Sequence, residues 1–118
     1  MPFFTRQEEQ LDKMSYVNMQ EMLERARKGG YALGAFNIVN HLTAWAALNA
    51  AEELASPLIL QTSTSVVKAY GTLALVEMVR PLAERARVPV ALHLDHCTEL
   101  GLLKECVEAG WSSVMFDG

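Results

Sequence analysis

The sequence has 118 residues, of which 51% are hydrophobic and 20% charged, and its formal net charge is -4 at pH 7, a composition typical of a globular chain rather than a disordered or fibrous one. The acidic balance provides no basic stripe, so we expect neither nucleic acid nor a membrane surface as a partner, whereas a small anionic substrate can still bind locally. No apolar run approaches the roughly 20 residues that span a bilayer, and the polar, acidic start from Met1 to Lys13 is unlike a signal peptide, which predicts a cytoplasmic protein.

Apolar periodicity and the positions of glycine and proline predict helices that alternate with four strands. The first helix begins after the cap residue Asn18 and ends at Gly29 and Gly30, which suit a left-handed terminator. The elements expected after it, in chain order, are strand 31–38, helix 43–54, strand 57–63, helix 72–87, strand 89–95, helix 99–109, closed by Gly110, and strand 112–117. This alternation indicates an α/β fold with a parallel sheet and right-handed crossovers.

The choice between an open doubly wound sheet and a barrel depends on how the strands alternate. In the predicted strands every second residue is strongly apolar. The residues between them are small or polar, and the last of these in each strand carries a functional group. A doubly wound sheet is covered by helices on both faces and favours apolar strands throughout. A barrel interior with polar groups at its carboxyl ends fits better, and no G-x-G-x-x-G turn follows the first strand.

We therefore predict the first half of a (β/α)8 TIM barrel, with about four parallel strands. A complete barrel of this kind takes about 200 to 250 residues. Residues 17–118 are assigned to this truncated barrel half and residues 1–16 to a polar leader. Two interpretations of the leader stay open: the natural start lies at Met14 and Ser15, or the leader is a disordered extension.

The predicted strands bring four polar residues to one mouth: Asn37, Ser63, Asp95 and Asp117. A carboxylate buried without a partner costs several kcal/mol, so Asp95 beside His96 at the end of an apolar run suggests a site for chemistry. Simpler roles compete with this interpretation. The Asp95–His96 pair can serve strand-end hydrogen bonding, Asn37 and Ser63 can satisfy backbone groups, and Asp117 can cap a following helix.

The remaining conspicuous side chains have simpler expected roles. His93 is expected to point inward as a hydrogen-bonded support rather than a metal ligand, and His41 to be solvated at a helix start. Cys97 and Cys106 follow neither a zinc-ribbon nor a disulfide spacing, so we expect reduced, space-filling thiols. Two tryptophans are expected to pack between helices and barrel: Trp45 and Trp111.

Four segments together carry a resemblance to a known family: Ala-Phe-Asn-Ile at 35–38, Pro-Leu-Ile-Leu-Gln-Thr-Ser at 57–63, Leu-His-Leu-Asp-His at 92–96 and Ser-Val-Met-Phe-Asp-Gly at 113–118. In this order and spacing the chain resembles the amino-terminal half of the class II, zinc-dependent ketose-bisphosphate aldolases, which include fructose-bisphosphate and tagatose-bisphosphate aldolases. The resemblance runs from about Val17 to the end. The segment at 92–96 is its most specific part.

The resemblance implies a role for each mouth residue. Asp95 matches the catalytic acid/base, and His96 matches one of three histidines that bind the catalytic Zn²⁺. Asn37 and Ser63 match contacts to the phosphorylated ketose substrate, and Asp117 matches a carboxylate at a second metal position. The implied reaction is the reversible cleavage of a ketose 1,6-bisphosphate to dihydroxyacetone phosphate and glyceraldehyde 3-phosphate, by a homodimer or homotetramer.

The chain departs from the family pattern by lacking the other two zinc histidines, the phosphate-binding loops and the second-site glutamate. One histidine cannot fill a three-ligand site, so we expect the chain to supply part of the active site and to be inactive in isolation. Two alternatives stay open: a non-catalytic fragment or assembly subunit of an aldolase-like barrel, and another barrel enzyme that uses Asp95 as a base without zinc.

Overall fold

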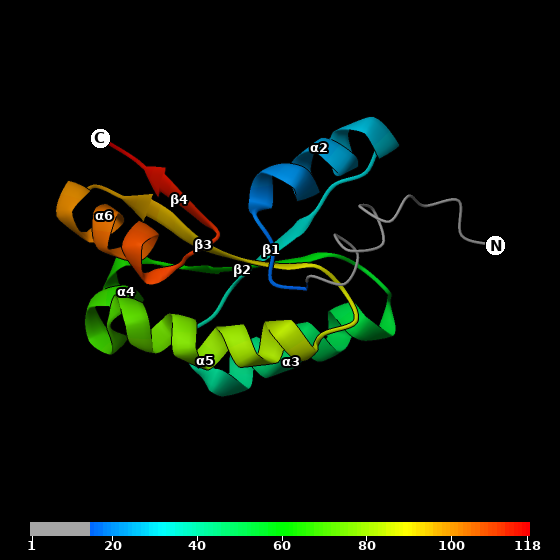
Figure 1. Cartoon of the computed structure of the whole chain (residues 1–118), viewed down its shortest axis with the longest axis horizontal. Coiled ribbons are helices and arrows are strands. Elements are labelled where there is room, and N and C mark those ends of the chain that lie inside the picture. The colour runs from blue at the N-terminus through cyan, green and yellow to red at the C-terminus, as the bar shows by residue number, and fades with distance from the viewer. Residues whose placement is uncertain (1–14) are drawn as a thin grey trace.

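The computed structural model describes residues 15–118, and most of the predicted leader lies outside the described residues. One sheet contains four parallel strands in the order β1-β2-β3-β4. The strands are β1 (Gly34–Asn37), β2 (Leu58–Thr62), β3 (Val90–Cys97) and β4 (Ser113–Phe116) (Figure 1). The predicted α/β fold with four parallel strands and crossover helices is confirmed.

Five helices flank this sheet in the described residues: α2 (Met19–Gly29), α3 (His41–Glu53), α4 (Thr64–Tyr70), α5 (Thr72–Arg85) and α6 (Leu100–Ala109). The sequence did not predict α4, whose amino-terminus is capped by the Ser63 side chain. Gly71, at φ 96°, separates α4 from α5. Helix α3 begins two residues earlier than predicted, because Asn40 and Thr43 form a reciprocal capping box.

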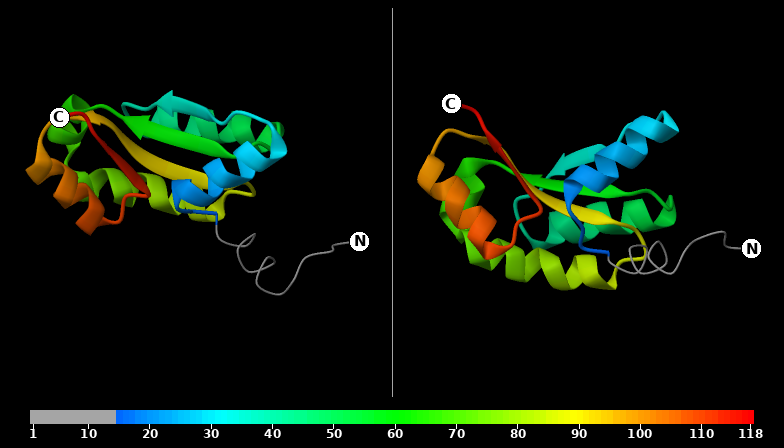
Figure 2. Two further views of the ribbon diagram at one scale, coloured as in Figure 1. Left: turned by 90° about the horizontal axis from the view of Figure 1, so that it is seen from above. Right: turned by 45° about the horizontal axis from the view of Figure 1, so that its top comes forward.

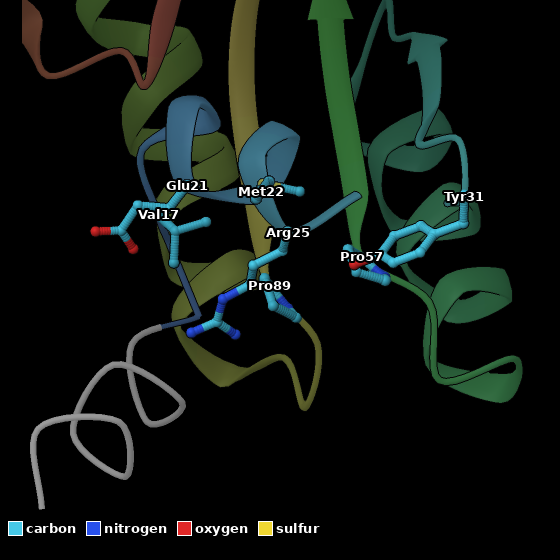
Figure 3. A pocket seen from close by; sticks show the side chains of 7 residues that line it. All are labelled: Val17, Glu21, Met22, Arg25, Tyr31, Pro57 and Pro89. Atoms are coloured by element: carbon cyan, nitrogen blue, oxygen red, sulfur yellow. The ribbon is translucent and has the colours of Figure 1, made fainter. Parts of the chain in front are cut away.

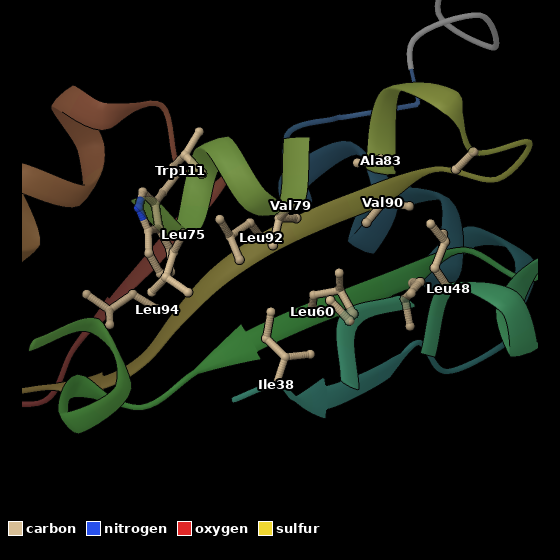
Figure 4. Packing of buried hydrophobic residues seen from close by; sticks show 14 of the residues in the cluster. Ile38, Leu48, Leu60, Leu75, Val79, Ala83, Val90, Leu92, Leu94 and Trp111 are labelled. Atoms are coloured by element: carbon tan, nitrogen blue, oxygen red, sulfur yellow. The ribbon is translucent and has the colours of Figure 1, made fainter. Parts of the chain in front are cut away.

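Helices α3 and α5 lie against one face of the sheet, and this face carries the main core (Figures 1 and 2). In Figure 4 the strand side chains meet those of α5 and α3 in a continuous apolar layer. Its fully buried members include Ile38, Leu60, Leu75, Val79, Leu92 and Leu94. Burial of one such side chain stabilises the fold by about 1.5–3 kcal/mol, so this layer holds the strands in register.

The opposite face of the sheet, which corresponds to the barrel interior, is covered by α2 near the amino-terminal ends of the strands (Figure 1). Met22 of α2 packs there on Ile59 and Ala91 in a small separate cluster. The sequence predicted the helix but not this position. As a result, the carboxyl half of the interior face is left to polar side chains.

The apolar strand positions at the sheet edges differ from the prediction. Phe36 on β1 is 56% exposed and Phe116 on β4 is 54% exposed, because each edge strand pairs on one side only in the described residues. Trp45 is also 48% exposed, so its predicted packing position is wrong. Trp111 is buried as expected, and its indole Nε1 donates to the Thr72 carbonyl oxygen at 3.0 Å.

The last two residues of the predicted leader belong to the fold. The backbone N–H of Val90 donates to the Ser15 carbonyl oxygen at 2.6 Å. Tyr16 forms a parallel bridge with Val90, and its hydroxyl donates to the Gly110 carbonyl oxygen at 2.7 Å. Residues 1–14 lie outside the description. Within residues 15–118, no helix combines the length and apolarity needed to cross a membrane.

Candidate active site

The parallel topology brings the four predicted mouth residues to one edge of the sheet. Asn37 ends β1, Ser63 directly follows β2 and Asp117 directly follows β4. Asp95 lies near the end of β3, and its side chain is 23% exposed. Because parallel strands end on the same side of a sheet, functional groups from separate chain segments become neighbours there.

A β-bulge near the end of β3 sets the geometry of the Asp95–His96 pair. The ladder with β4 pairs Leu94 with Val114 but Cys97 with Phe116, so β3 holds one extra residue. His96 has a φ of 47°, an uncommon value for a residue with a side chain. Regular alternation would place residue 96 beside Leu94 in the core. Instead Cys97 is fully buried there, and His96 stays on the open side with Asp95.

Polar contacts link β3 to β4 and to Asp117, which follows β4, around the Asp95 carboxylate. Its Oδ1 lies 3.6 Å from His93 Nε2, and its Oδ2 lies 3.7 Å from His96 Nε2. The other nitrogen of His93 lies 3.0 Å from Ser113 Oγ. The other nitrogen of His96 lies 3.1 Å from Asp117 Oδ2. One carboxylate is therefore held between two imidazoles, each of which has a further polar partner.

The two imidazoles differ in their surroundings. Burial lowers the pKa of His93, and the Asp95 carboxylate offsets part of this effect. The lowered pKa favours the neutral form of the His93 ring. The hydrogen bond with Asp117 raises the pKa of the exposed His96, and the Asp95 charge acts in the same direction. The expectation that His93 points inward as a hydrogen-bonded support is confirmed.

Asn37 and Ser63 have different local partners. The Gln61 side-chain Nε2 donates to Asn37 Oδ1 at 2.7 Å, which holds the Asn37 amide at the mouth. Ser63 caps α4 by accepting from the Val66 N–H at 3.4 Å. Within residues 15–118, no side-chain hydrogen bond joins Ser63 to the cluster of Asp95, His93 and His96. Sequence reasoning missed Gln61, although its inward strand position two residues before Ser63 was a usable signal.

The residues fit part of a zinc site. A neutral imidazole is a preferred zinc donor, and a carboxylate on its second nitrogen orients such a ligand. His96 has this arrangement, with Asp117 at Nδ1. Within residues 15–118, however, no group of three His, Cys, Asp or Glu side chains is placed to hold a metal ion. His96 therefore fits as one ligand, and the donor set is incomplete in the described chain.

A small cavity lies at the opposite, amino-terminal end of the strands and has a volume of about 90 Å³ (Figure 3). It is lined by Val17, Glu21, Met22, Arg25, Tyr31, Pro57 and Pro89. None of the predicted site residues lines this cavity. This cavity is thus separate from the candidate site at the carboxyl ends of the strands.

Parallel strands with crossover helices, and polar side chains gathered at the carboxyl ends of the strands, are features that (β/α)8 barrels share. A sequence profile described as "Fructose-bisphosphate aldolase class-II" matches residues 17–118. The chain belongs to this class II aldolase family.

Individual relatives agree with this assignment. The chain is 47% identical over 97 residues to a fructose-bisphosphate aldolase of Thermus caldophilus, covering 82% of this chain and 32% of that protein. It is 39% identical over 105 residues to a sulfofructosephosphate aldolase of Alkalicoccus urumqiensis, covering 89% of this chain and 37% of that protein. It is 43% identical over 108 residues to a 6-phospho-5-dehydro-2-deoxy-D-gluconate aldolase of Halalkalibacterium halodurans, covering 89% of this chain and 38% of that protein.

Solved structures agree as well. The YdjI aldolase of Escherichia coli K12 superimposes with a TM-score of 0.79 at 27% identity, over 87% of this chain and 39% of that one. The chain thus spans between 32% and 39% of the length of these four proteins.

Proposed function

We propose that the chain contributes the proton-transfer group and one zinc ligand to an aldolase that cleaves and forms a carbon–carbon bond in a phosphorylated ketose. The substrate proposed is a ketose 1,6-bisphosphate, with dihydroxyacetone phosphate and glyceraldehyde 3-phosphate as products. The names of the three relatives share a phosphorylated substrate, which supports this class. The observation that carries the proposal is the Asp95 carboxylate held between two imidazoles at the carboxyl end of β3.

The chemistry required is a proton exchange beside a polarised carbonyl. In the cleavage direction Asp95 accepts the proton of the substrate hydroxyl as the carbon–carbon bond breaks. The electron pair of that bond passes to the ketose-derived fragment, which takes a proton from water to give dihydroxyacetone phosphate, and condensation reverses these steps. A bound Zn²⁺ would supply Lewis-acid polarisation of the ketose carbonyl. His96 is the proposed ligand from this chain, and Asp117 is the proposed carboxylate at a second metal position. Asn37 and Ser63 are proposed to contact the substrate. The other zinc ligands are proposed to come from outside residues 15–118, and the enzyme is proposed to act as a homodimer or homotetramer in the cytoplasm.

The test is aldol cleavage of fructose 1,6-bisphosphate by the full-length enzyme that carries these residues, with zinc content measured alongside. Asp95→Asn should reduce turnover at least a hundredfold and leave bound zinc unchanged, since general acid–base catalysis contributes about 10²–10⁴-fold. His96→Ala should remove both zinc and turnover. Glu108→Gln, at an exposed acid on α6, is the matched control and should change neither.

Each alternative predicts a different result. Full turnover by Asp95→Asn would overturn the assignment of the acid/base. Turnover that resists chelation but needs Asp95 would favour a barrel enzyme that uses this base without zinc. Absence of turnover in every variant, wild type included, would favour a non-catalytic subunit.

A further inference from the structure

Ser113 and His93 are direct neighbours across two parallel strands. The ladder of β3 and β4 pairs these two residues in register, and the serine Oγ lies 3.0 Å from His93 Nδ1. The histidine ring is nearly enclosed, because its side chain is 10% exposed. Its second nitrogen, Nε2, lies 3.6 Å from Asp95 Oδ1. The three side chains therefore form one line from β4 to the proposed acid/base.

One arrangement of protons suits all three groups at once. A carboxylate oxygen is an acceptor, so a proton on the His93 nitrogen that faces Asp95 at 3.6 Å is favourable, whereas a lone pair there is repelled. A neutral imidazole has a single N–H, which leaves Nδ1 as an acceptor. The Ser113 hydroxyl then donates to Nδ1. Burial, which lowers the pKa of His93, favours this neutral ring.

We infer that Ser113 is a positioning residue, which holds His93 as the Nε2–H tautomer and through it orients the Asp95 carboxylate. The inference rests on the proposed function, because it concerns the group that transfers the proton there. With Oδ1 facing the His93 N–H, Oδ2 is the oxygen turned toward His96 and the open mouth. This oxygen is then the one that exchanges a proton with the substrate. Loss of the Ser113 hydroxyl lets His93 adopt either tautomer and lets Asp95 rotate.

The chain offers a matched control in the adjacent serine. Ser112 Oγ accepts a hydrogen bond from the Leu92 backbone N–H at 3.1 Å. Ser112→Ala removes a hydrogen bond of similar length to the backbone of β3 and leaves the His93 ring with its partners. Ser113→Thr keeps a hydroxyl at the position and serves as the conservative variant.

The tautomer is read by long-range ¹H–¹⁵N correlation of the 118-residue chain labelled at its three histidines, with His93→Gln to assign the signals. We expect a protonated Nε2 and an unprotonated Nδ1 in the wild type, in Ser112→Ala and in Ser113→Thr, and averaged nitrogen shifts in Ser113→Ala. In the full-length enzyme, Ser113→Ala should lower kcat about tenfold with KM nearly unchanged, as expected when a proton-transfer group is mispositioned. Ser113→Thr should restore most of the loss.

A wild-type His93 protonated at Nδ1, or a Ser113→Ala spectrum identical to wild type, would overturn the inference. Equal losses of kcat in Ser112→Ala and Ser113→Ala would also overturn it, because they would indicate a structural effect alone. These results differ from a failure of the proposed function, which shows as full turnover in Asp95→Asn.

Discussion

Three helices within residues 15–118 end in the same backbone motif, and one of them has an unfavourable residue at the left-handed position. A residue just past each helix end adopts left-handed φ: 70° at Gly30 after α2, 50° at Ala55, two residues after α3, and 98° at Gly110 after α6. The N–H of the next residue then donates to the carbonyl five positions earlier, at 3.0, 2.9 and 3.1 Å. This is the Schellman motif, which favours glycine at the left-handed position. The substitution to test is Ala55→Gly.

The expected change in the free energy of unfolding comes from the backbone conformation, because the Ala55 side chain is exposed and buries little surface. A left-handed conformation costs an L-residue roughly 1–2 kcal/mol. Replacing alanine by glycine removes this cost, but it also increases the entropy of the unfolded chain, which lowers the free energy of unfolding by about 0.4–1 kcal/mol. Ala55→Gly should therefore raise the free energy of unfolding by about 0.5–1 kcal/mol. The reverse change, Gly110→Ala, should lower it by a similar amount, since a Cβ there meets no atom within 4 Å.

Urea unfolding followed by circular dichroism measures both changes as shifts of the midpoint at constant slope. A gain of 1 kcal/mol corresponds to about 4–8 °C in Tm for a domain near this size. Ala46→Gly is the control, because Ala46 is exposed within α3 and its replacement should cost about 1 kcal/mol. The reasoning is refuted if Ala55→Gly destabilises the chain as Ala46→Gly does.

Three further predictions concern buried and paired side chains. The Thr62 hydroxyl is buried without a hydrogen-bond partner among the described residues, so Thr62→Val should be neutral or stabilise the chain by about 1 kcal/mol; a clear loss in urea unfolding would contradict this. Burial raises the pKa of the Cys106 thiol to about 12, so iodoacetamide at pH 8 should label it far more slowly in the folded chain than in urea, and equal rates in peptide mapping would count against this protection. Gln61→Ala removes the donor to Asn37 and should raise KM for the ketose phosphate several-fold with a smaller effect on kcat; steady-state kinetics with an unchanged KM would exclude this role.

Much of the fold follows from local patterns in the sequence. Period-two apolar alternation located all four strands, and the glycines after α2 and α6 marked the ends of those helices. Helix α3 has no such glycine, but its end was still located to within one residue. The positions that failed depend on distant parts of the chain. Phe36, Phe116 and Trp45 are exposed because no described element covers them, which no local pattern reports.

The candidate site was predictable only where it depends on the local alternation of residues along a strand. Strand phase brought Asn37 and Asp95 to one mouth, but strict alternation assigns residue 96 to the opposite side of β3. The bulge that turns His96 back depends on pairing with β4, about twenty residues later in the chain, so a pattern confined to β3 cannot reveal it. The helix α4 and its cap at Ser63 were missed because Val66 and Val67 are β-branched residues, which favour strands.

The bulge connects the stability of the fold with the geometry of the site. Leu94 and Cys97 are both fully buried in the helix-side core, although they lie three residues apart. A regular strand would place them on opposite faces, so burying both forces one extra residue into the strand between them. His96 absorbs this mismatch at φ 47°, close to the value at Ala55. Glycine would relieve the strain at either position, but at residue 96 it would also remove the imidazole that meets Asp95 and Asp117. The core packing on one face of β3 thus fixes the acid and the imidazole side by side on the other.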